Sequence, residues 1–310
     1  MIIDIHTHLG DILYPGGGDL IWQKGIRKKI FYDIISHSEL MLHKSAPFFF
    51  LEKWIYTASA YLITLAERAR NATATLENFS RSMDDNGIKA SACMPVPPFL
   101  TFDDLNKSAQ KEPRLIPFTG VDFTGKDDVA AALGKDVAAG ARGLKLHPII
   151  QKTSLTDKKT FEAVEAFAVH DLPVLFHCGI SSYYLGTEKK RNQNSDFGAI
   201  NDAKKLVAAF PHVTFIAGHA GMFQYKEVIA LLAGHANVMV DTSIQAPSRV
   251  RELISAFGPD RVMYASDWPW GNREPAIKII KKACNGDKSL ERKLFYDNAA
   301  KVLRLENMKI

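Results

Sequence analysis

The sequence predicts an α/β fold, a (β/α)8 TIM barrel in which eight parallel strands are each followed by helical chain. Two observations predict it. From about residue 72 onward, short apolar runs alternate with longer segments of helical spacing, and glycine or proline stands at most of the joints. Eight strand-length runs of this kind are typical of a closed barrel. An open, doubly wound sheet is disfavoured, because no Gly-x-Gly-x-x-Gly follows the first strand.

The elements follow one another in a regular order. Strands are expected at Ile2–Ile5, Lys89–Pro95, Leu115–Val121, Gly143–His147, Pro173–His177, Val213–His219, Val238–Asp241 and Val262–Ser266. Helices are expected at Phe102–Glu112, Asp127–Ala139, Lys158–His170, Ala199–Phe210, Phe223–Leu232, Ser248–Phe257 and, closing the chain, Leu290–Leu303. We interpret residues 1–310 as a single barrel domain.

Residues 10–75 form an insertion after the first strand. Helices are expected here at Leu20–His43 and Phe48–Asn71, following a turn at Pro15–Gly18. The insertion is rich in aromatic residues, namely Phe48, Phe49, Phe50, Trp54, Tyr56 and Tyr61. Such a surface has to be covered, so the insertion is either a layer packed on the barrel, a cap over the active site or the interface of a homodimer.

Composition excludes several classes of protein. The 310 residues are 46% hydrophobic and 24% charged, values of an ordinary globular protein, and the net charge of +5 is scattered. The basic runs 27–29 and 189–191 are too short to indicate a nucleic-acid partner. Three distant cysteines fit a reducing cytoplasm, and the most apolar stretch, Trp54–Ala66, is too short to span a membrane. We therefore expect a cytoplasmic protein that acts on a small molecule.

Metal-ligating residue types stand at the ends of the expected strands. His6 and His8 are two residues apart on the first strand, so both rings project to one side. His177, His219 and Asp267 end the fifth, sixth and eighth strands. In a parallel barrel all these positions share one rim, and divalent metals such as zinc prefer this nitrogen and oxygen set.

Lys145 lies inside the fourth strand and faces the same rim. A buried lysine beside a metal is electrostatically unfavourable unless it loses its positive charge. Reaction with carbon dioxide would make it an anionic carbamate that can bridge two ions. A lysine that reaches solvent or binds a substrate carboxylate is the alternative.

Five motifs together resemble the amidohydrolase superfamily, and its amidohydrolase 2 branch most closely. They are Asp-Ile-His-Thr-His from residue 4, Gly-Leu-Lys-Leu-His-Pro from 143, Phe-His-Cys-Gly from 176, Gly-His-Ala-Gly from 218 and Ser-Asp-Trp-Pro from 266. The resemblance implies that His6, His8 and Asp267 hold a buried metal ion, and that His177 and His219 hold a second one.

The resemblance also leaves the number of ions, one or two, open. Lys145 falls on the lysine that is carboxylated in dihydroorotases, which favours two ions, whereas His147 stands where those enzymes carry tyrosine. Decarboxylases of the branch look mononuclear, and on that interpretation His219 is an acid or base instead of a ligand.

Two reactions are compatible with this set. The main expectation is hydrolysis of a small amide, lactone, lactam or ester by a metal-activated hydroxide, with Asp267 taking and returning the proton. The alternative is metal-dependent decarboxylation of an aromatic or unsaturated acid, in which His219 or Asp267 protonates carbon. A deoxyribonuclease and a catalytically inactive binding module are disfavoured, because no basic stripe is evident and every expected ligand position is filled.

Substrate contacts are expected from two loops at the same rim. Aromatic and basic side chains there suit a planar or anionic molecule. The candidates are His147, Tyr183, Tyr184, Arg191, Trp268, Trp270 and Arg273.

Overall fold

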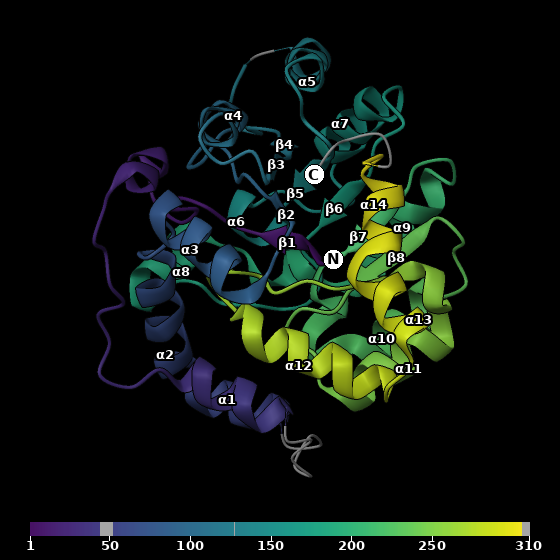
Figure 1. The fold of residues 1–310 in the computed structure, drawn as a ribbon. Helices are drawn as coiled ribbons and strands as arrows, with labels where there is room; N and C mark the ends of the chain where they lie inside the picture. The colour runs from purple at the N-terminus through teal and green to yellow at the C-terminus, as the bar shows by residue number, and fades with distance from the viewer. Residues whose placement is uncertain (44–51, 127, 306–310) are drawn as a thin grey trace.

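The computed structural model describes residues 1–43, 52–126 and 128–305, and side chains outside 40–57. Its strands form the inner ring of an α/β barrel, and helices surround it (Figure 1). The strands are β1 (Ile3–Thr7), β2 (Ala90–Cys93), β3 (Leu115–Pro117), β4 (Thr119–Gly120), β5 (Leu144–Leu146), β6 (Val174–Phe176), β7 (Phe215–Ala217), β8 (Val238–Asp241) and β9 (Val262–Met263). Every paired neighbour is parallel, and the order in space follows the order in the chain, so the predicted fold class is confirmed.

The ring closes at two seams. The predicted third strand is divided into β3 and β4, because the Phe118 amide donates to Cys93 on one side while the Thr119 amide donates to Gly143 on the other. At the second seam the amide of Ile5 donates to the carbonyl oxygen of Tyr264 at 3.2 Å, which joins β1 to the chain after β9. With β3 and β4 counted as one, eight strand positions complete the barrel.

Each helix predicted outside the insertion is present, with bounds set by local caps, and the structure adds four helices that the sequence analysis did not predict, at 76–86, 148–151, 186–192 and 273–284. The helices outside the insertion are α3 (Leu76–Asn86), α4 (Phe102–Ala109), α5 (Val129–Ala138), α6 (Pro148–Gln151), α7 (Lys158–Ala168), α8 (Gly186–Asn192), α9 (Ile200–Ala209), α10 (Tyr225–Leu232), α11 (Pro247–Phe257), α12 (Arg273–Cys284), α13 (Lys288–Arg292) and α14 (Asn298–Val302). At α4, for example, Thr101 and Asp104 form a capping box, which satisfies the first free amides. The predicted closing helix is divided into α13 and α14 by a π-helical turn at Lys293–Asp297.

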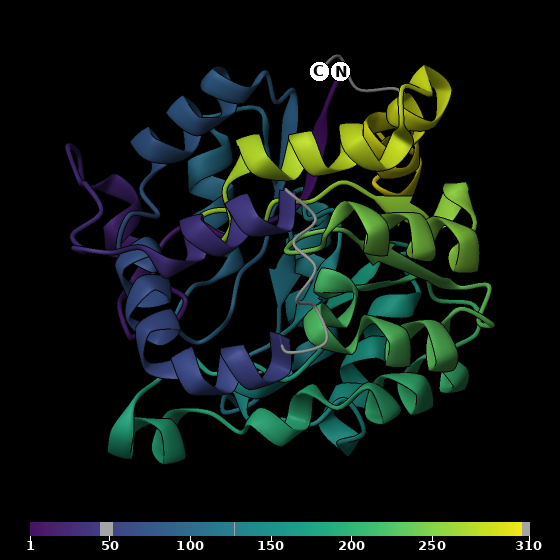
Figure 2. The same cartoon turned by 90° about the horizontal axis from the view of Figure 1, so that it is seen from below.

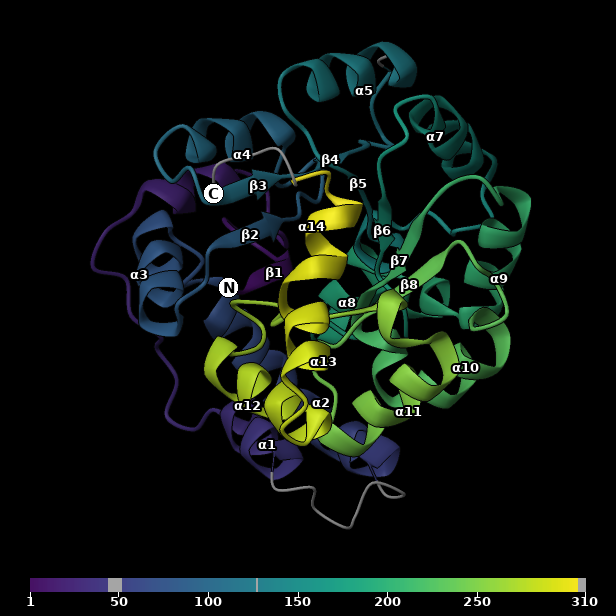
Figure 3. The same cartoon turned by 45° about the vertical axis from the view of Figure 1, so that its right-hand side comes forward.

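The barrel interior is a separate apolar cluster. Its members alternate along the strands with residues that pack under the helices, as the period of two requires. Ala299, Ala300 and Leu303 of α14 belong to this interior cluster, and Figure 3 shows α14 crossing the barrel beside β1. The described part of the chain contains no helix that is long and apolar enough to cross a membrane.

The insertion differs from its prediction. A single helix over Leu20–His43 is wrong: a 3-10 turn (Gly17–Trp22) is followed by irregular chain, and α1 (Ile34–His43) begins only after Asp33. The Asp33 carboxylate accepts hydrogen bonds from the amides of Ile35 and Ser36, which makes it the local start signal.

The second helix of the insertion, α2, covers Glu52–Asn71, and the aromatic run 48–50 lies outside the described residues, as do the side chains of Trp54 and Tyr56. Tyr61 is exposed on the outer face of α2. Figures 1 and 2 show α1 lying alongside α12, so the insertion packs next to the end of the barrel sequence.

Candidate active site

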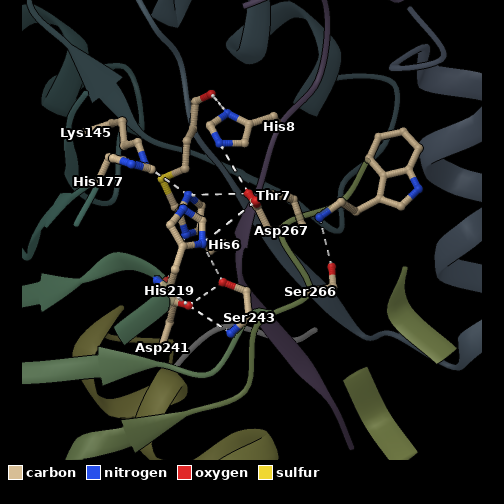
Figure 4. Close-up of polar contacts among 12 residues, drawn as sticks. His6, Thr7, His8, Lys145, His177, His219, Asp241, Ser243, Ser266 and Asp267 are labelled. Carbon is tan, nitrogen blue, oxygen red and sulfur yellow. Dashed lines mark hydrogen bonds and ion pairs between the residues drawn. The ribbon is translucent and has the colours of Figure 1, made fainter. Parts of the chain in front are cut away.

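The first strand places two imidazoles at the mouth of the barrel (Figure 4). Nδ1 of His6 lies 2.8 Å from Oδ2 of Asp241, and Nδ1 of His8 lies 3.1 Å from the carbonyl oxygen of Met94. A carboxylate and a carbonyl oxygen only accept, so both Nδ1 atoms carry the proton and both Nε2 atoms keep a lone pair. Burial lowers the pKa of both rings well below the ordinary value. β1 and the residue that follows it therefore present two neutral imidazole nitrogens at the mouth.

Asp267 brings a carboxylate to the same point from the end of the last strand. Its amide donates to the carbonyl oxygen of His6, and its φ of 58° turns the chain at this residue. Oδ1 of Asp267 lies 3.6 Å from Nε2 of His8 and 3.8 Å from Nε2 of His6. This oxygen is buried and has no hydrogen-bond partner among the described residues. A buried, unpaired carboxylate oxygen is costly, and a cation shared with the two nitrogens would satisfy it.

His219 lies on the other side of that carboxylate. Its Nδ1 is 2.8 Å from Oγ of Ser243 and 3.8 Å from Oδ2 of Asp267, and its ring stacks on His6 with centroids 4.8 Å apart. The segment from His219 to Met222 has positive φ throughout, which turns the chain sharply at the end of β7. His219 is thereby held over His6 at the mouth.

Asp241 at the end of β8 connects these groups, and the sequence analysis missed it as a site residue. Its Oδ2 accepts from His6, while its Oδ1 accepts from the His219 amide at 2.9 Å and from the Ser243 hydroxyl at 2.6 Å. Because Ser243 donates to Asp241, its oxygen is free to accept the His219 proton. Asp241 ends a strand just as His177 and Asp267 do, so the same criterion would have found it.

Lys145 reaches the centre of the site from β5. Its Nζ lies 2.9 Å from Nε2 of His6, and the side chain is fully buried. Burial lowers the pKa of Lys145 to about 7, although the carboxylates of Asp267 and Asp241 raise it in part. An amine with this pKa is partly neutral at neutral pH.

His177 and His147 form a second group on the β5 and β6 side. Their rings stack with centroids 4.4 Å apart, and His147 also caps α6 through Nδ1. Nε2 of His177 donates to the carbonyl oxygen of Gly179 at 3.0 Å, and its Nδ1 lies 3.4 Å from the hydroxyl of Tyr183. Both nitrogens of His177 therefore have protein partners.

The predicted substrate residues divide into two groups. Tyr183 and Trp270 are buried beside the histidines, with Tyr183 set edge-on against both His147 and Trp270. Arg191 is exposed on α8, and the structure does not bring it to the histidines. Trp268 packs edge-on against Phe79, away from the mouth.

Arg273 and Tyr184 are engaged in structural contacts instead of lining the site. The guanidinium of Arg273 is buried and bonds Asp4, Ser91 and the carbonyl oxygen of Phe79. The hydroxyl of Tyr184 donates to the carbonyl oxygen of Leu13, which ties the loop after β6 to the loop after β1. The sequence could not distinguish these loop residues from substrate contacts, because the distinction depends on the direction of each side chain.

The residues at the mouth fit a divalent metal ion. In the described part of the chain, His6, His219 and Asp267 form a group whose ligand atoms lie within 4.8 Å of one another. His8 adds a further lone-pair nitrogen beside Asp267. A set of neutral imidazoles and one carboxylate is a suitable donor set for manganese, zinc or iron.

Comparisons with known proteins identify the family and the fold. A sequence profile of the amidohydrolase family matches residues 3–305. No curated protein is similar enough in sequence to count as a relative.

Many solved structures share the fold, and three of them illustrate it. The first is 5-carboxyvanillate decarboxylase from Novosphingobium aromaticivorans, complexed with manganese and a nitrobenzoic acid, with 16% identity, TM-score 0.64, and 98% of this chain and 96% of that chain covered. The second, 2,6-dihydroxybenzoate decarboxylase from Rhizobium, has 13% identity, TM-score 0.64 and 98% of both chains covered. The third, a probable 2-pyrone-4,6-dicarboxylic acid hydrolase from Acinetobacter baumannii with citric acid bound, has 15% identity, TM-score 0.59, and 98% and 99% covered.

Proposed function

We propose that this chain, which belongs to the amidohydrolase family, is a metal-dependent decarboxylase of a small aromatic carboxylic acid. The observation that carries the proposal is the group at the mouth, in which the Asp267 carboxylate lies 3.6 Å from His8 and 3.8 Å from both His6 and His219. The two decarboxylases of the same fold support it. We therefore place decarboxylation with one ion, the alternative that the sequence left open, ahead of hydrolysis with two ions.

His6, His8 and Asp267 would hold the ion. Their Nε2 lone pairs and Oδ1 adjoin, and none of the three atoms is committed to a carboxylate or carbonyl partner. The ion, when bound, would supply a positive charge that orients the substrate carboxylate and a neighbouring hydroxyl. Manganese is the first candidate, since a neighbour of the same fold contains it, and zinc is the second.

The chain's own residues would supply the proton. When the bond between ring carbon and carboxylate breaks, carbon dioxide leaves and the electron pair stays with the ring, which then takes one proton. His219 and Asp267 would hold it: Ser243 accepts the Nδ1 proton of His219, which leaves Nε2 of that ring to carry a further proton, and Oδ2 of Asp267 lies 3.8 Å from Nδ1. Ser243 and Asp241 fix the orientation of the His219 ring.

The test is carbon dioxide release. Protein reconstituted with manganese is offered a panel of dihydroxybenzoate and carboxyvanillate isomers, and the gas and the decarboxylated phenol are measured in parallel. We expect equal amounts of both products, loss of turnover after chelation and recovery on adding manganese. Uptake of water with no gas released, on any substrate of the panel, would overturn the proposal.

Hydrolysis of a lactone is the second candidate, and Lys145 is the observation that favours it. Its lowered pKa leaves a neutral amine available for carboxylation, which would allow two ions to be bridged. The hydrolase of the same fold makes pyrone lactones the first substrates to try. Mass spectrometry of the intact chain distinguishes the two cases: a mass increase of one carbon dioxide that is lost in Lys145→Met, with two ions per chain, favours hydrolysis.

A further inference from the structure

Hydrogen bonds to the loops of the barrel fasten helix α2 of the insertion over the barrel mouth. Thr64 donates to the carbonyl oxygen of Ser182 at 3.3 Å, Arg70 to that of Trp270 at 2.8 Å, and Asn71 to the carboxylate of Asp11 at 2.6 Å. These acceptors lie in the loops after β6, β9 and β1. Residues 64, 67 and 71 share one helical face, so Glu67 faces the mouth between two of these anchors.

Glu67 carries a buried oxygen that no described residue satisfies. The residue is partly exposed, but Oε2 is shut off from solvent and has no hydrogen-bond partner. Arg70, the cation whose charge acts on it, already bonds Asp33, Ser36 and a carbonyl oxygen.

Trp270 offers a second unsatisfied atom at the same mouth. The residue is 5% exposed, and its Nε1 has no hydrogen-bond partner among the described residues. Its ring lies 5.6 Å from the ring of Tyr183, which in turn lies 5.3 Å from that of His147. A continuous series of rings therefore connects Trp270 with the histidines, so the indole borders the site.

The chemistry of the two atoms selects one kind of ligand group. An indole N–H only donates, and a carboxyl oxygen accepts, or donates when protonated. Among the described residues, the guanidinium groups of Arg70 and Arg273 are engaged by the protein. A second substrate carboxylate would thus face Glu67 without a free cation. A hydroxyl group both donates and accepts, so it satisfies either atom.

We propose that Glu67 and Trp270 are specificity-determining residues, which select an aromatic substrate bearing a ring hydroxyl on the side away from the reacting carboxylate. This inference rests on the proposed function, since it specifies the substrate of the same site. On this proposal the insertion contributes to the choice of substrate, and the residues at the strand ends carry out the reaction.

The test is calorimetric binding of unreactive phenols to the full chain loaded with manganese. The probes are ortho-nitrophenol, in which a nitro group replaces the carboxylate, and its ring-hydroxylated relatives nitrohydroquinone, nitroresorcinol and nitrocatechol. We expect at least one relative to bind about tenfold more tightly than ortho-nitrophenol, the contribution of one or two hydrogen bonds. In Glu67→Ala or Trp270→Phe that ratio should fall to about one to threefold, with ortho-nitrophenol binding unchanged.

Glu67→Gln tests whether a loss in Glu67→Ala comes only from misfolding. Glutamine keeps the shape of the side chain and an acceptor oxygen, so this variant should retain part of the affinity ratio between the hydroxylated probe and ortho-nitrophenol. Glu188→Gln on α8 is the matched control and should leave the ratio as in the wild type. An unchanged ratio in both Glu67→Ala and Trp270→Phe overturns this inference and leaves the proposed function intact. Failure of every nitrophenol to bind overturns both, because it removes the substrate class itself.

Discussion

The two sides of the barrel mouth carry the same residue type and use it differently. On the β1 side, Asp241 accepts a hydrogen bond from Nδ1 of His6, and a backbone carbonyl oxygen accepts one from Nδ1 of His8. The Nε2 lone pairs of both rings therefore lie beside Asp267. On the β6 side, His177 places one nitrogen on Gly179 and the other against Tyr183. The two sides therefore differ in what lies beside the second nitrogen, which is the Tyr183 hydroxyl for His177 and Asp267 together with Lys145 for His6.

Electrostatics strengthens this comparison. Burial holds the pKa of His177 down to about 3 and that of His147 well below its ordinary value, so both sides present neutral imidazoles. The sides differ in their carboxylates, because Asp241 and Asp267 both contact the β1 side. A cation is thus stabilised on one side, which favours one ion per chain.

Replacing one residue from each side should give the largest difference. Asp267→Asn should abolish decarboxylation and weaken manganese binding by more than about 100-fold. Replacing a residue that only supports a ligand costs at most about 100-fold in metal affinity, and losing a ligand should cost more. His177→Asn should weaken it by about tenfold at most. Manganese titration followed by metal analysis measures both. Equal losses in the two variants would show that the sides bind the ion together.

Removing the connection between the β1 ligand and the acid–base residue should have the next largest effect. Asp241→Asn weakens the contacts to both His6 and His219, so manganese affinity should fall about 10- to 100-fold and turnover with it. Ser243→Ala removes the hydroxyl that contacts both His219 and Asp241 but leaves the contact of Asp241 with His6, so it should lower kcat while manganese affinity stays within about threefold of wild type. Normal turnover in Asp241→Asn would contradict the role given to this carboxylate.

Glu67, on helix α2 above the two sides of the mouth, should make the free energy of unfolding depend on pH. Burial raises the pKa of Glu67 to about 8 from 4.5, and Arg70 offsets this only in part. As pH rises from about 4.5 to 8, the unfolded chain gives up this proton before the folded chain does, so the free energy of unfolding falls across that window. Glu67→Gln removes this loss.

The Tm of Glu67→Gln should therefore exceed that of the wild type by about 2 °C or more at pH 8, and by less at pH 5. Differential scanning calorimetry without metal at the two pH values measures this. A Tm difference that does not grow with pH would mean that Glu67 is solvated and titrates like an ordinary glutamate.

The smallest effect is expected for Arg191. The sequence made it a substrate contact, whereas the structure exposes it on α8, away from both sides of the mouth. Arg191→Ala should therefore leave kcat/KM within about twofold of wild type, as surface substitutions usually do. A tenfold rise in KM would restore the sequence-based interpretation and would mean that α8 also contacts the substrate.

The sequence by itself determined the barrel and the identity of most mouth residues. Parallel strands that follow one another in chain order bring all their carboxyl ends to one rim, so His6, His177, His219 and Asp267 had to meet there. Only local details of the fold could not be predicted in this way. The register change at Phe118 and the late start of α1 at Ile34 depend on hydrogen bonds that no apolar pattern encodes.

Tertiary structure decided which of these residues can act. The hydrogen bond to Asp241 that fixes the tautomer of His6 joins residues 235 apart in the chain, and the salt bridge between Arg273 and Asp4 joins residues 269 apart. The placement of Glu67 over the mouth likewise depends on where α2 is anchored. A motif records which side chain stands at a strand end. The free lone pair, the burial and the partner of that side chain arise only when distant segments pack, since each is a property of contacts between them.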